Sequence, residues 1–383
     1  MTMQELLTLS GIFAMLHEYL IPFILTISLV VFVHEYGHYW VARRCGVRIM
    51  VFSIGFGPEI WGWNDKHGTR WKLAAIPLGG YVKMFGDEDA ASTPDGSVYR
   101  MSEAEKRIAF YHQKVWKRIA IVLAGPAANY AFTILLMIIM FATYGEPYTE
   151  PVAEIVMPDT AAAAAGIKPG DRIKAIDGRK IERFLDLQRI TMLNTGTPMH
   201  LEIEREGEII ALELTPRLTD MVDRFGMKHK TARIGIASTT GDYRQLSWPD
   251  ATLEAFAAAL ELTRETLTAV YQMAVGLRGA EELGGALRIA KMTGDVVKSR
   301  AIPDYIWFVI LISLNLGLVN LFPIPLMDGG HVAFYLYEML RGKPLSERVQ
   351  EYAARIGAIL LVSLLIFTTW NDIVQISGAT LPQ

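Results

Sequence analysis

The chain has very little cysteine and little charge within its apolar stretches. Cys45 is the only cysteine in 383 residues, which excludes a disulfide framework and a cysteine-based metal site. The net charge of −3 provides none of the positive excess that nucleic-acid binding requires, so we expect no nucleic-acid partner. Residues 1–21 contain no lysine or arginine and therefore lack the basic segment of a signal peptide. We expect the first apolar stretch to remain in the mature protein.

Apolar residues are abundant instead. The chain is 51% hydrophobic and only 20% charged, with a mean hydropathy of +0.26. Four stretches are long enough, or nearly so, to cross a bilayer: residues 20–42, 119–144, 305–327 and 356–370. The basic residues that flank them fall on one side if the chain alternates, and we interpret that side as the cytoplasm. Both termini and residues 145–304 then face outward, and the lipid bilayer is an expected partner.

Residues 34–38 read His-Glu-Tyr-Gly-His near the end of the first apolar stretch. His34 and His38 are one helical turn apart on one face, so both imidazoles could reach one metal ion. Glu35 is placed beside them to take a proton from a water molecule at that metal. Because ionisable groups are costly inside an apolar segment, we interpret the three residues as a metal site rather than a chance match.

Residues 47–86 alternate apolar and polar side chains like strands, with Gly55 and Gly57 among the turn residues. We expect a β-hairpin at the membrane face. Its unpaired edge could receive an extended substrate by strand addition. An ordinary interfacial loop fits the same pattern equally well.

The segment after the second apolar stretch has the pattern of a soluble unit. Within residues 150–217 we expect helices at 160–165 and 183–194, and strands at 152–156, 172–176, 201–205 and 209–214. A polar loop is predicted at residues 218–230 and a last strand at 233–237. Residues 249–276 have helical periodicity with few charges, which favours an amphipathic helix lying on the membrane.

Two histidines leave a tetrahedral zinc ion short of one protein ligand, and Asp328 is the best candidate for it. Pro323 and Pro325 break the third apolar stretch just before it, which lets a carboxylate turn inward. The predicted topology places Asp328 on the same side of the membrane as the histidine pair. His331 could be a fourth ligand, but four protein ligands would close the site to water. We favour a supporting or surface role for His331.

Three asparagines lie inside apolar stretches. Asn315 and Asn320 could hold the backbone of a substrate, or they could hydrogen-bond neighbouring helices, and the residues alone do not favour either. Asn129 ends the small-residue segment Ala-Gly-Pro-Ala-Ala-Asn, which suits close helix approach. We interpret Asn129 as structural.

The motifs at residues 34–38, 52–58, 76–84, 124–129 and 320–331 together resemble those of the site-2 protease family of intramembrane zinc metalloproteases. The chain is most similar to the bacterial members that cut anti-sigma factors. Residues 150–217 resemble a PDZ domain, through the turn at 165–171. These motifs occur in the order of the family and span nearly the whole chain. Met327 stands where leucine is common, and one PDZ repeat is found where well-known members have two.

The resemblance implies a Zn²⁺ cofactor held by His34, His38 and Asp328, with Glu35 as the catalytic residue. It implies that Asn315 and Asn320 contact the substrate, and that the hairpin carrying Gly55 and Gly57 clamps it as an added strand. It also implies the bacterial inner membrane, with an active site near the cytoplasmic side and a periplasmic PDZ domain.

The expected fold class is a polytopic α-helical membrane protein with about four transmembrane helices, an inserted extracytoplasmic α+β PDZ domain and a membrane-associated β-hairpin. The expected boundaries are 1–46 for the first helix, 47–118 for the hairpin and a short helix, 119–146 for the second transmembrane helix, 147–238 for the PDZ domain, 239–303 for an interfacial helical segment and 304–383 for the last two helices.

The predicted function is hydrolysis of a peptide bond within the transmembrane segment of a single-span protein, such as an anti-sigma factor, after a first protease has trimmed it. The alternative is a membrane scaffold that binds proteins through the PDZ domain and cuts nothing. A zinc transporter ranks last, because the polar groups gather near one face instead of following a path across the membrane.

Overall fold

The computed structural model describes residues 16–87, 101–222, 228–238, 242–280 and 283–377. The start of the predicted 1–46 segment and part of the predicted 218–230 loop lie outside these residues. The chain divides into two compact units. The first comprises residues 1–137 and 284–372, and the second comprises residues 138–283 and 373–383.

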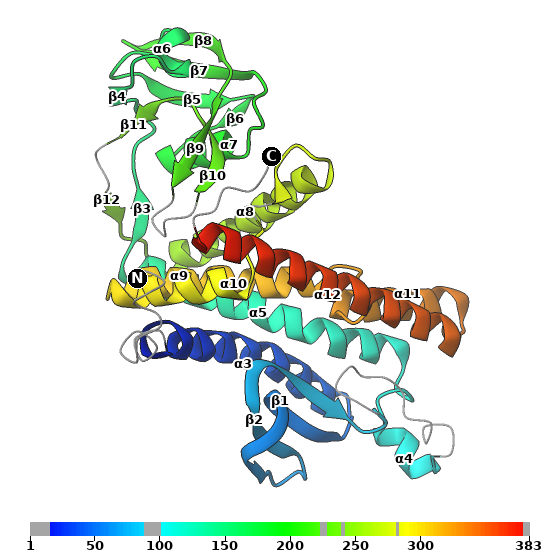
Figure 1. Ribbon diagram of the computed structural model, residues 1–383. Coiled ribbons are helices and arrows are strands. Elements are labelled where there is room, and N and C mark those ends of the chain that lie inside the picture. Colours follow the sequence, from blue (N-terminus) through cyan, green and yellow to red (C-terminus); the bar gives the residue numbers. More distant parts are fainter. Residues whose placement is uncertain (1–15, 88–100, 223–227, 239–241, 281–282, 378–383) are drawn as a thin grey trace. The chain divides into compact units, whose positions relative to one another are not determined.

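Four helices are long and apolar enough to cross a membrane (Figure 1). They are α3 (Ile21–Arg44), which follows a short π-helix η1 (Leu16–Leu20), α5 (Val115–Thr143), α10 (Ile302–Asn320) and α12 (Glu347–Ser377). The shorter helices α4 (Glu103–Ile108), α9 (Ala286–Lys298) and α11 (Asp328–Arg341) complete the first unit. The four predicted apolar stretches each correspond to one long helix, and the chain is a membrane protein.

The third apolar stretch is shorter than predicted. We expected a span over residues 305–327, but α10 ends at Asn320 and α11 begins at Asp328. Pro323 and Pro325 lie between the two helices, where they cannot supply the backbone N–H groups that a continuing helix needs. Leu326 adopts a φ of 76°, a backbone conformation that costs energy for a side chain with a Cβ. The resulting turn places Asp328 at the first position of a new helix.

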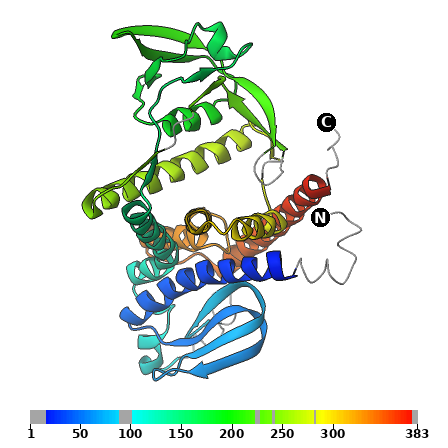
Figure 2. The ribbon, with the colours of Figure 1, turned by 90° about the vertical axis from the view of Figure 1, so that its left-hand side faces the viewer.

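β1 (Ile49–Asn64) and β2 (Arg70–Met84) form the predicted hairpin, but each strand bends sharply near its middle. Residues 49–54 of β1 pair with residues 80–84 on one side and with residues 70–73 on the other. Residues 59–64 pair with residues 70–74. The sheet therefore has four segments side by side, and residues 80–84 form one outer edge. Figures 1 and 2 both show it packed beside α3.

Gly55 and Gly57 lie at the bend of β1, with φ values of 90° and 87°. A residue with a Cβ rarely adopts such angles, so these glycines permit the fold-back of the strand. The bend turns what the sequence predicts as two long strands into a compact sheet.

The second unit is built on a four-stranded antiparallel sheet in the order β6-β5-β7-β8. Its strands are β5 (Arg172–Ile176), β6 (Arg179–Lys180), β7 (Met199–Arg205) and β8 (Glu208–Leu214). Helices α6 (Ala161–Ala164) and α7 (Phe184–Met192) pack on it, and β4 (Ile155–Val156) pairs with β11 (Ile236–Ala237). The core includes Ile173, Ile176, Leu187, Leu201 and Ile203, all fully or almost fully buried. Most predicted elements of residues 150–217 are present.

The predicted polar loop at residues 218–230 is wrong in its described parts. Two further strands, β9 (Arg217–Val222) and β10 (Lys228–Arg233), pair in antiparallel register. Leu218, Met221 and Val222 give β9 adequate strand propensity, but the interspersed charges hide the alternation that identifies a strand.

The two connections that enter and leave this sheet domain pair with each other. β3 (Glu146–Tyr148) follows α5, and β12 (Asp242–Arg244) precedes α8 (Trp248–Ala274). Glu146 is buried on β3 and accepts charge-assisted hydrogen bonds from Arg183 and Arg244. A buried carboxylate needs such partners. Glu146 on β3 thus links Arg244 on β12 to Arg183, the residue just before α7.

Candidate active site

The His-Glu-Tyr-Gly-His segment lies in the last three turns of α3, as its position in the apolar stretch predicts. His34 and His38 are both buried, and their Nε2 atoms are 3.2 Å apart. The Nδ1 atom of His38 is 2.8 Å from the carbonyl oxygen of Ile121 on α5. Nδ1 must therefore carry the proton and donate it to that carbonyl, which leaves the lone pair of Nε2 directed into the site.

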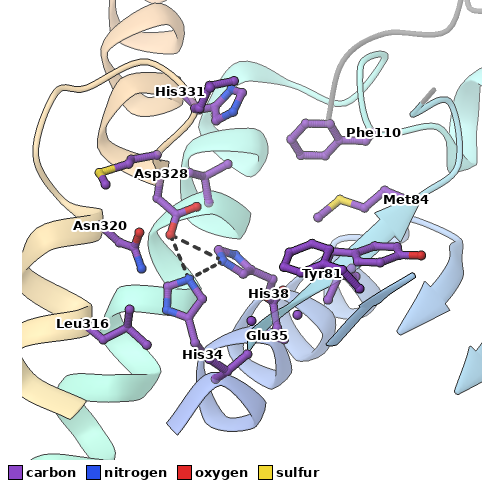
Figure 3. A pocket seen from close by; sticks show the side chains of 18 of the residues that line it. His34, Glu35, His38, Tyr81, Met84, Phe110, Leu316, Asn320, Asp328 and His331 are labelled. Carbon is purple, nitrogen blue, oxygen red and sulfur yellow. Dashed lines mark hydrogen bonds and ion pairs between the residues drawn. The ribbon is translucent and has the colours of Figure 1, made fainter. Parts of the chain in front are cut away.

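Asp328 joins this pair from 290 residues away in the chain (Figure 3). Its Oδ2 atom is 3.1 Å from Nε2 of His34 and 3.5 Å from Nε2 of His38. Nitrogen and oxygen ligands lie about 2.0–2.2 Å from zinc, so two corners of a tetrahedral zinc site are about 3.3 Å apart. The three distances between the ligand atoms in this structure, 3.1, 3.2 and 3.5 Å, all lie near that value.

The surroundings of the three side chains also fit a cation. Oδ2 of Asp328 is buried and accepts no hydrogen bond in the described part of the structure, which is costly for a carboxylate oxygen without a counter-charge. Gly125 of α5 lies directly against the pair. A Cβ at this position would collide with Nε2 of His38 and lie 2.9 Å from Cε1 of His34. The space that Gly125 leaves is needed by the imidazoles.

Glu35 lines the same cavity as His34, His38 and Asp328, a space of about 420 Å³. The lining also includes Gly80 and Tyr81 of β2, at the outer edge of the hairpin sheet. Gly80 approaches closely enough that a Cβ there would lie 3.1 Å from Cγ of Glu35. The cavity is therefore surrounded by the Glu35 carboxylate, the three potential metal ligands and a strand edge of the hairpin sheet.

The two asparagines of α10 differ in their position relative to the cavity. Asn320 lines the cavity, and Figure 3 shows its side chain on the same side as Asp328. Asn315 does not line it, and its Nδ2 donates a hydrogen bond of 2.9 Å to the carbonyl oxygen of Leu311. Five residues correspond to about 140° around a helix, so the two side chains cannot point the same way. Gly55 and Gly57 also lie outside the lining of this cavity.

Asn129 is closer to the site than its sequence context suggested. Its side-chain amide is fully buried, with Nδ2 3.4 Å from Nδ1 of His34, while its Oδ1 has no partner among the described residues. Exchanging the two amide atoms, which differ little in shape, would let Oδ1 accept a proton from Nδ1 of His34. That bond would leave Nε2 of His34 free for a metal, as Ile121 does for His38.

His331 lines the cavity but does not belong to the cluster of three potential ligands. Its ring stacks on Tyr335 one turn further along α11, with centroids 6.4 Å apart. Tyr335 in turn lies under the guanidinium of Arg118, which forms a buried ion pair with Glu338. These contacts fix α11 against α5, and so fix the helix that starts with Asp328.

Comparison with solved structures returns a PDZ domain of an SdrC-like protein from Listeria monocytogenes. It is 24% identical and covers 25% of this chain and 88% of that one, but its TM-score is 0.18. A value this low carries no argument about the fold of residues 147–238.

The sequence comparisons are decisive. Peptidase family M50 matches residues 22–364. A protein of Agrobacterium fabrum named as a candidate zinc metalloprotease is 44% identical, over 94% of this chain and 97% of its own length. A similarly named protein of Rhizobium meliloti is 43% identical over 94% and 98%. The metalloprotease MmpA of Caulobacter vibrioides is 35% identical over 92% and 95%. This chain belongs to Peptidase family M50, and it is a zinc metalloprotease.

Proposed function

We propose that His34, His38 and Asp328 are the zinc ligands and that Glu35 is the catalytic residue. The observation that carries the proposal is the set of three ligand atoms at tetrahedral spacing, with the Glu35 carboxylate lining the same cavity. Three protein ligands leave one position for water or substrate, as hydrolytic zinc sites require.

When bound, zinc would supply Lewis-acid polarisation of the scissile carbonyl and of the attacking water. Glu35 accepts the proton that this water loses and returns it to the amine that leaves. His38 is held in its tautomer by the carbonyl of Ile121, so the donor atom does not need to reorient. The peptide bond breaks between the carbonyl carbon and the amide nitrogen, and each fragment receives one part of the water.

We propose that the substrate is the transmembrane segment of another membrane protein. A helix hides its carbonyl groups in internal hydrogen bonds, so such a segment must unwind before it can be cut. Among the described residues, 80–84 have a strand partner on one side only, and residues 79–82 line the cavity. An unwound segment could pair with this edge as an added strand, while Asn320 hydrogen-bonds its backbone. For Asn315, Gly55 and Gly57, which lie outside the cavity lining, substrate contact stays a prediction.

The surrounding organisation follows from the same proposal. We propose that residues 147–238 are a PDZ domain on the periplasmic side of the bacterial inner membrane, with the active site near the cytoplasmic side. In that position the domain would admit only single-span proteins whose outer part has already been removed, such as trimmed anti-sigma factors. The chain would then act in regulated intramembrane proteolysis within an envelope stress response.

The alternative, a membrane scaffold without proteolysis, predicts no role for an acid beside the histidines. The discriminating experiment co-expresses the chain with a tagged single-span substrate that lacks its outer domain, and compares wild type with Glu35→Gln. We expect cleavage by wild type alone, with equal zinc content in both proteins, since glutamine cannot accept the proton. Glu351→Gln, the same change at an exposed acid of α12 that lies outside the cavity lining, is a matched control.

Cleavage by both proteins would remove Glu35 from the mechanism. Equal zinc content without cleavage of any trimmed substrate by wild type would favour the scaffold. Loss of zinc in Glu35→Gln would instead assign Glu35 a role in holding the metal.

A further inference from the structure

We infer that the end of α3 and the turn between β1 and β2 form a binding site for the phosphate of an anionic lipid headgroup. The two elements border an open cavity of about 590 Å³, which shares no lining residue with the cavity of the proposed active site. Its lining consists of four aromatic residues, four basic residues and one acid. This inference is independent of the proposed function.

The four basic side chains reach this cavity from two separate parts of the chain. Arg43 and Arg44 lie in the last turn of α3, and Lys66 and His67 lie in the turn that joins the two hairpin strands. Within the part of the chain that the structure describes, none of these four side chains forms an ion pair with an acid. Positive charges that gather in one space repel one another, so an anion that binds between them is favoured.

The one acid of the lining, Asp65, is engaged in hydrogen bonds that build the cavity wall. Its Oδ1 accepts from the backbone N–H groups of His67 and Thr69, at 2.8 and 2.9 Å. Its Oδ2 accepts from the hydroxyl of Tyr39 at 3.0 Å and from Nε1 of Trp71 at 3.1 Å. These bonds fix the turn and two aromatic side chains, so the cavity is formed before any ligand binds.

Aromatic side chains also hold the two arginines at the cavity. Nη1 of Arg43 donates a hydrogen bond of 2.8 Å to the hydroxyl of Tyr39. The guanidinium carbon of Arg44 lies 4.5 Å from the centroid of the Trp40 ring. A guanidinium has five N–H donors, and its contact with an aromatic face uses none of them. Arginine matches the oxygens of a phosphate with pairs of such donors, which makes phosphate the anion that fits this cavity.

The surface that leads to the cavity indicates that the phosphate belongs to a lipid. Helix α3 is one of the four helices that are long and apolar enough to cross a membrane. Four of its large side chains lie along one face and are between 42% and 63% exposed: Leu25, Leu29, Tyr36 and Trp40. This stripe ends at the basic cavity. Acyl chains fit the apolar stripe, aromatic residues favour the headgroup level, and basic clusters at the end of a membrane helix attract anionic headgroups.

The test measures lipid retention by native mass spectrometry of the full chain, released from micelles that contain phosphatidylglycerol or phosphatidylcholine. Arg44→Gln combined with Lys66→Gln removes two charges from the cavity and none of the hydrogen bonds of Asp65. Arg341→Gln combined with Lys343→Gln, at exposed positions near the end of α11, is the matched control. We expect wild type and control to retain the anionic lipid several-fold more than the zwitterionic one, and the cavity variant to lose this preference.

A conservative pair, Arg44→Lys with Lys66→Arg, keeps both charges and should keep most of the preference, which separates loss of charge from misfolding. Equal retention of both lipids by wild type would overturn the inference, and so would an unchanged preference in the glutamine variant of the cavity. An equal loss in the control pair would also overturn it, because any surface charge would then suffice.

Soluble glycerol phosphate, added at the concentration of the lipid, distinguishes the two sources of the phosphate. We expect lipid retention to persist in its presence. Displacement of the lipid by bound glycerol phosphate would assign the cavity to a soluble phosphate ester and overturn the lipid assignment.

Discussion

At the scale of single residues, the site depends on the missing side chain of Gly125 as much as on the proposed ligands. Alanine is more stable than glycine in a helix by about 1 kcal/mol, so a glycine in the middle of α5 is unfavourable on its own. Its place is explained by the imidazoles of His34 and His38, which occupy the space of a Cβ. The small residue was visible in the sequence, but its contact with the histidines was not.

Gly125→Ala should therefore weaken zinc binding by at least about ten-fold, the scale of changes that disturb the supports of a metal ligand. Alanine favours a helix more than glycine, so helix propensity alone predicts a more stable α5 in Gly125→Ala. A loss of zinc affinity in this variant would therefore not be explained by a weaker helix. Zinc content after dialysis against a chelator series measures the change. Ala127→Ser, an exposed site on the same helix, is the control. Equal zinc retention by Gly125→Ala and wild type would contradict the close packing of this site.

At the scale of elements, the sheet domain contains a buried ion pair, Asp171–Arg205, that connects the start of β5 to the end of β7. Asp171 is almost completely buried and accepts two hydrogen bonds of 2.7 Å from Arg205 and one of 2.7 Å from the backbone N–H of Lys168. The hydrogen bonds from Arg205 hold the pKa of the Asp171 carboxyl below its usual value, and burial only partly opposes them. The charged form is thus favoured in the folded domain.

A carboxyl with a depressed pKa in the folded state stabilises it above the unfolded pKa of about 3.9 and loses this contribution as pH falls through the folded value. We expect the free energy of opening of β5 and β7 to fall on acidification below about pH 4. Asp171→Asn should lower it at neutral pH and remove this part of the pH dependence. Amide hydrogen exchange of the full chain, corrected for intrinsic rates, measures both. An unchanged pH slope in Asp171→Asn would assign the acid sensitivity to other groups.

At the scale of the whole molecule, the proposed ligands connect parts of the chain that are far apart in sequence. His34 and His38 lie on α3, and Asp328 begins α11. A metal that binds all three is a cross-link within the first unit, and it stabilises only the folded state in which the three side chains meet. At a free zinc concentration 100 times its Kd, this amounts to about 2.7 kcal/mol.

Removal of zinc with a chelator should lower the unfolding temperature of the first unit and leave that of the second unchanged, because all three proposed ligands belong to the first. Added zinc should restore it. In Asp328→Ala, the unfolding temperature of the first unit should be the same with and without chelator. Differential scanning calorimetry of the full chain resolves the two transitions. A chelator effect of the same size in Asp328→Ala would place the stabilising metal elsewhere.

The sequence by itself determined what depends on near neighbours. The i, i+4 spacing of His34 and His38, the presence of four apolar spans and the alternation in residues 201–214 are local patterns, and the structure reproduces each of them, although not the predicted length of the third span. Asp328 also stood out, because an acid after two prolines in an apolar segment is rare. Resemblance to a known family then added roles that the residues alone left open.

Only the tertiary structure decided which distant groups meet. In the structure Asn320 lines the cavity and Asn315 does not. Asn129 lies against His34. The two strands bend into four paired segments, so that residues 80–84 form an edge at the site. The tertiary structure also turned acidic residues of α8 toward α7. Each of these outcomes depends on contacts between residues far apart in the chain, and no local spacing records them, because the free energy of such contacts comes from the packed fold.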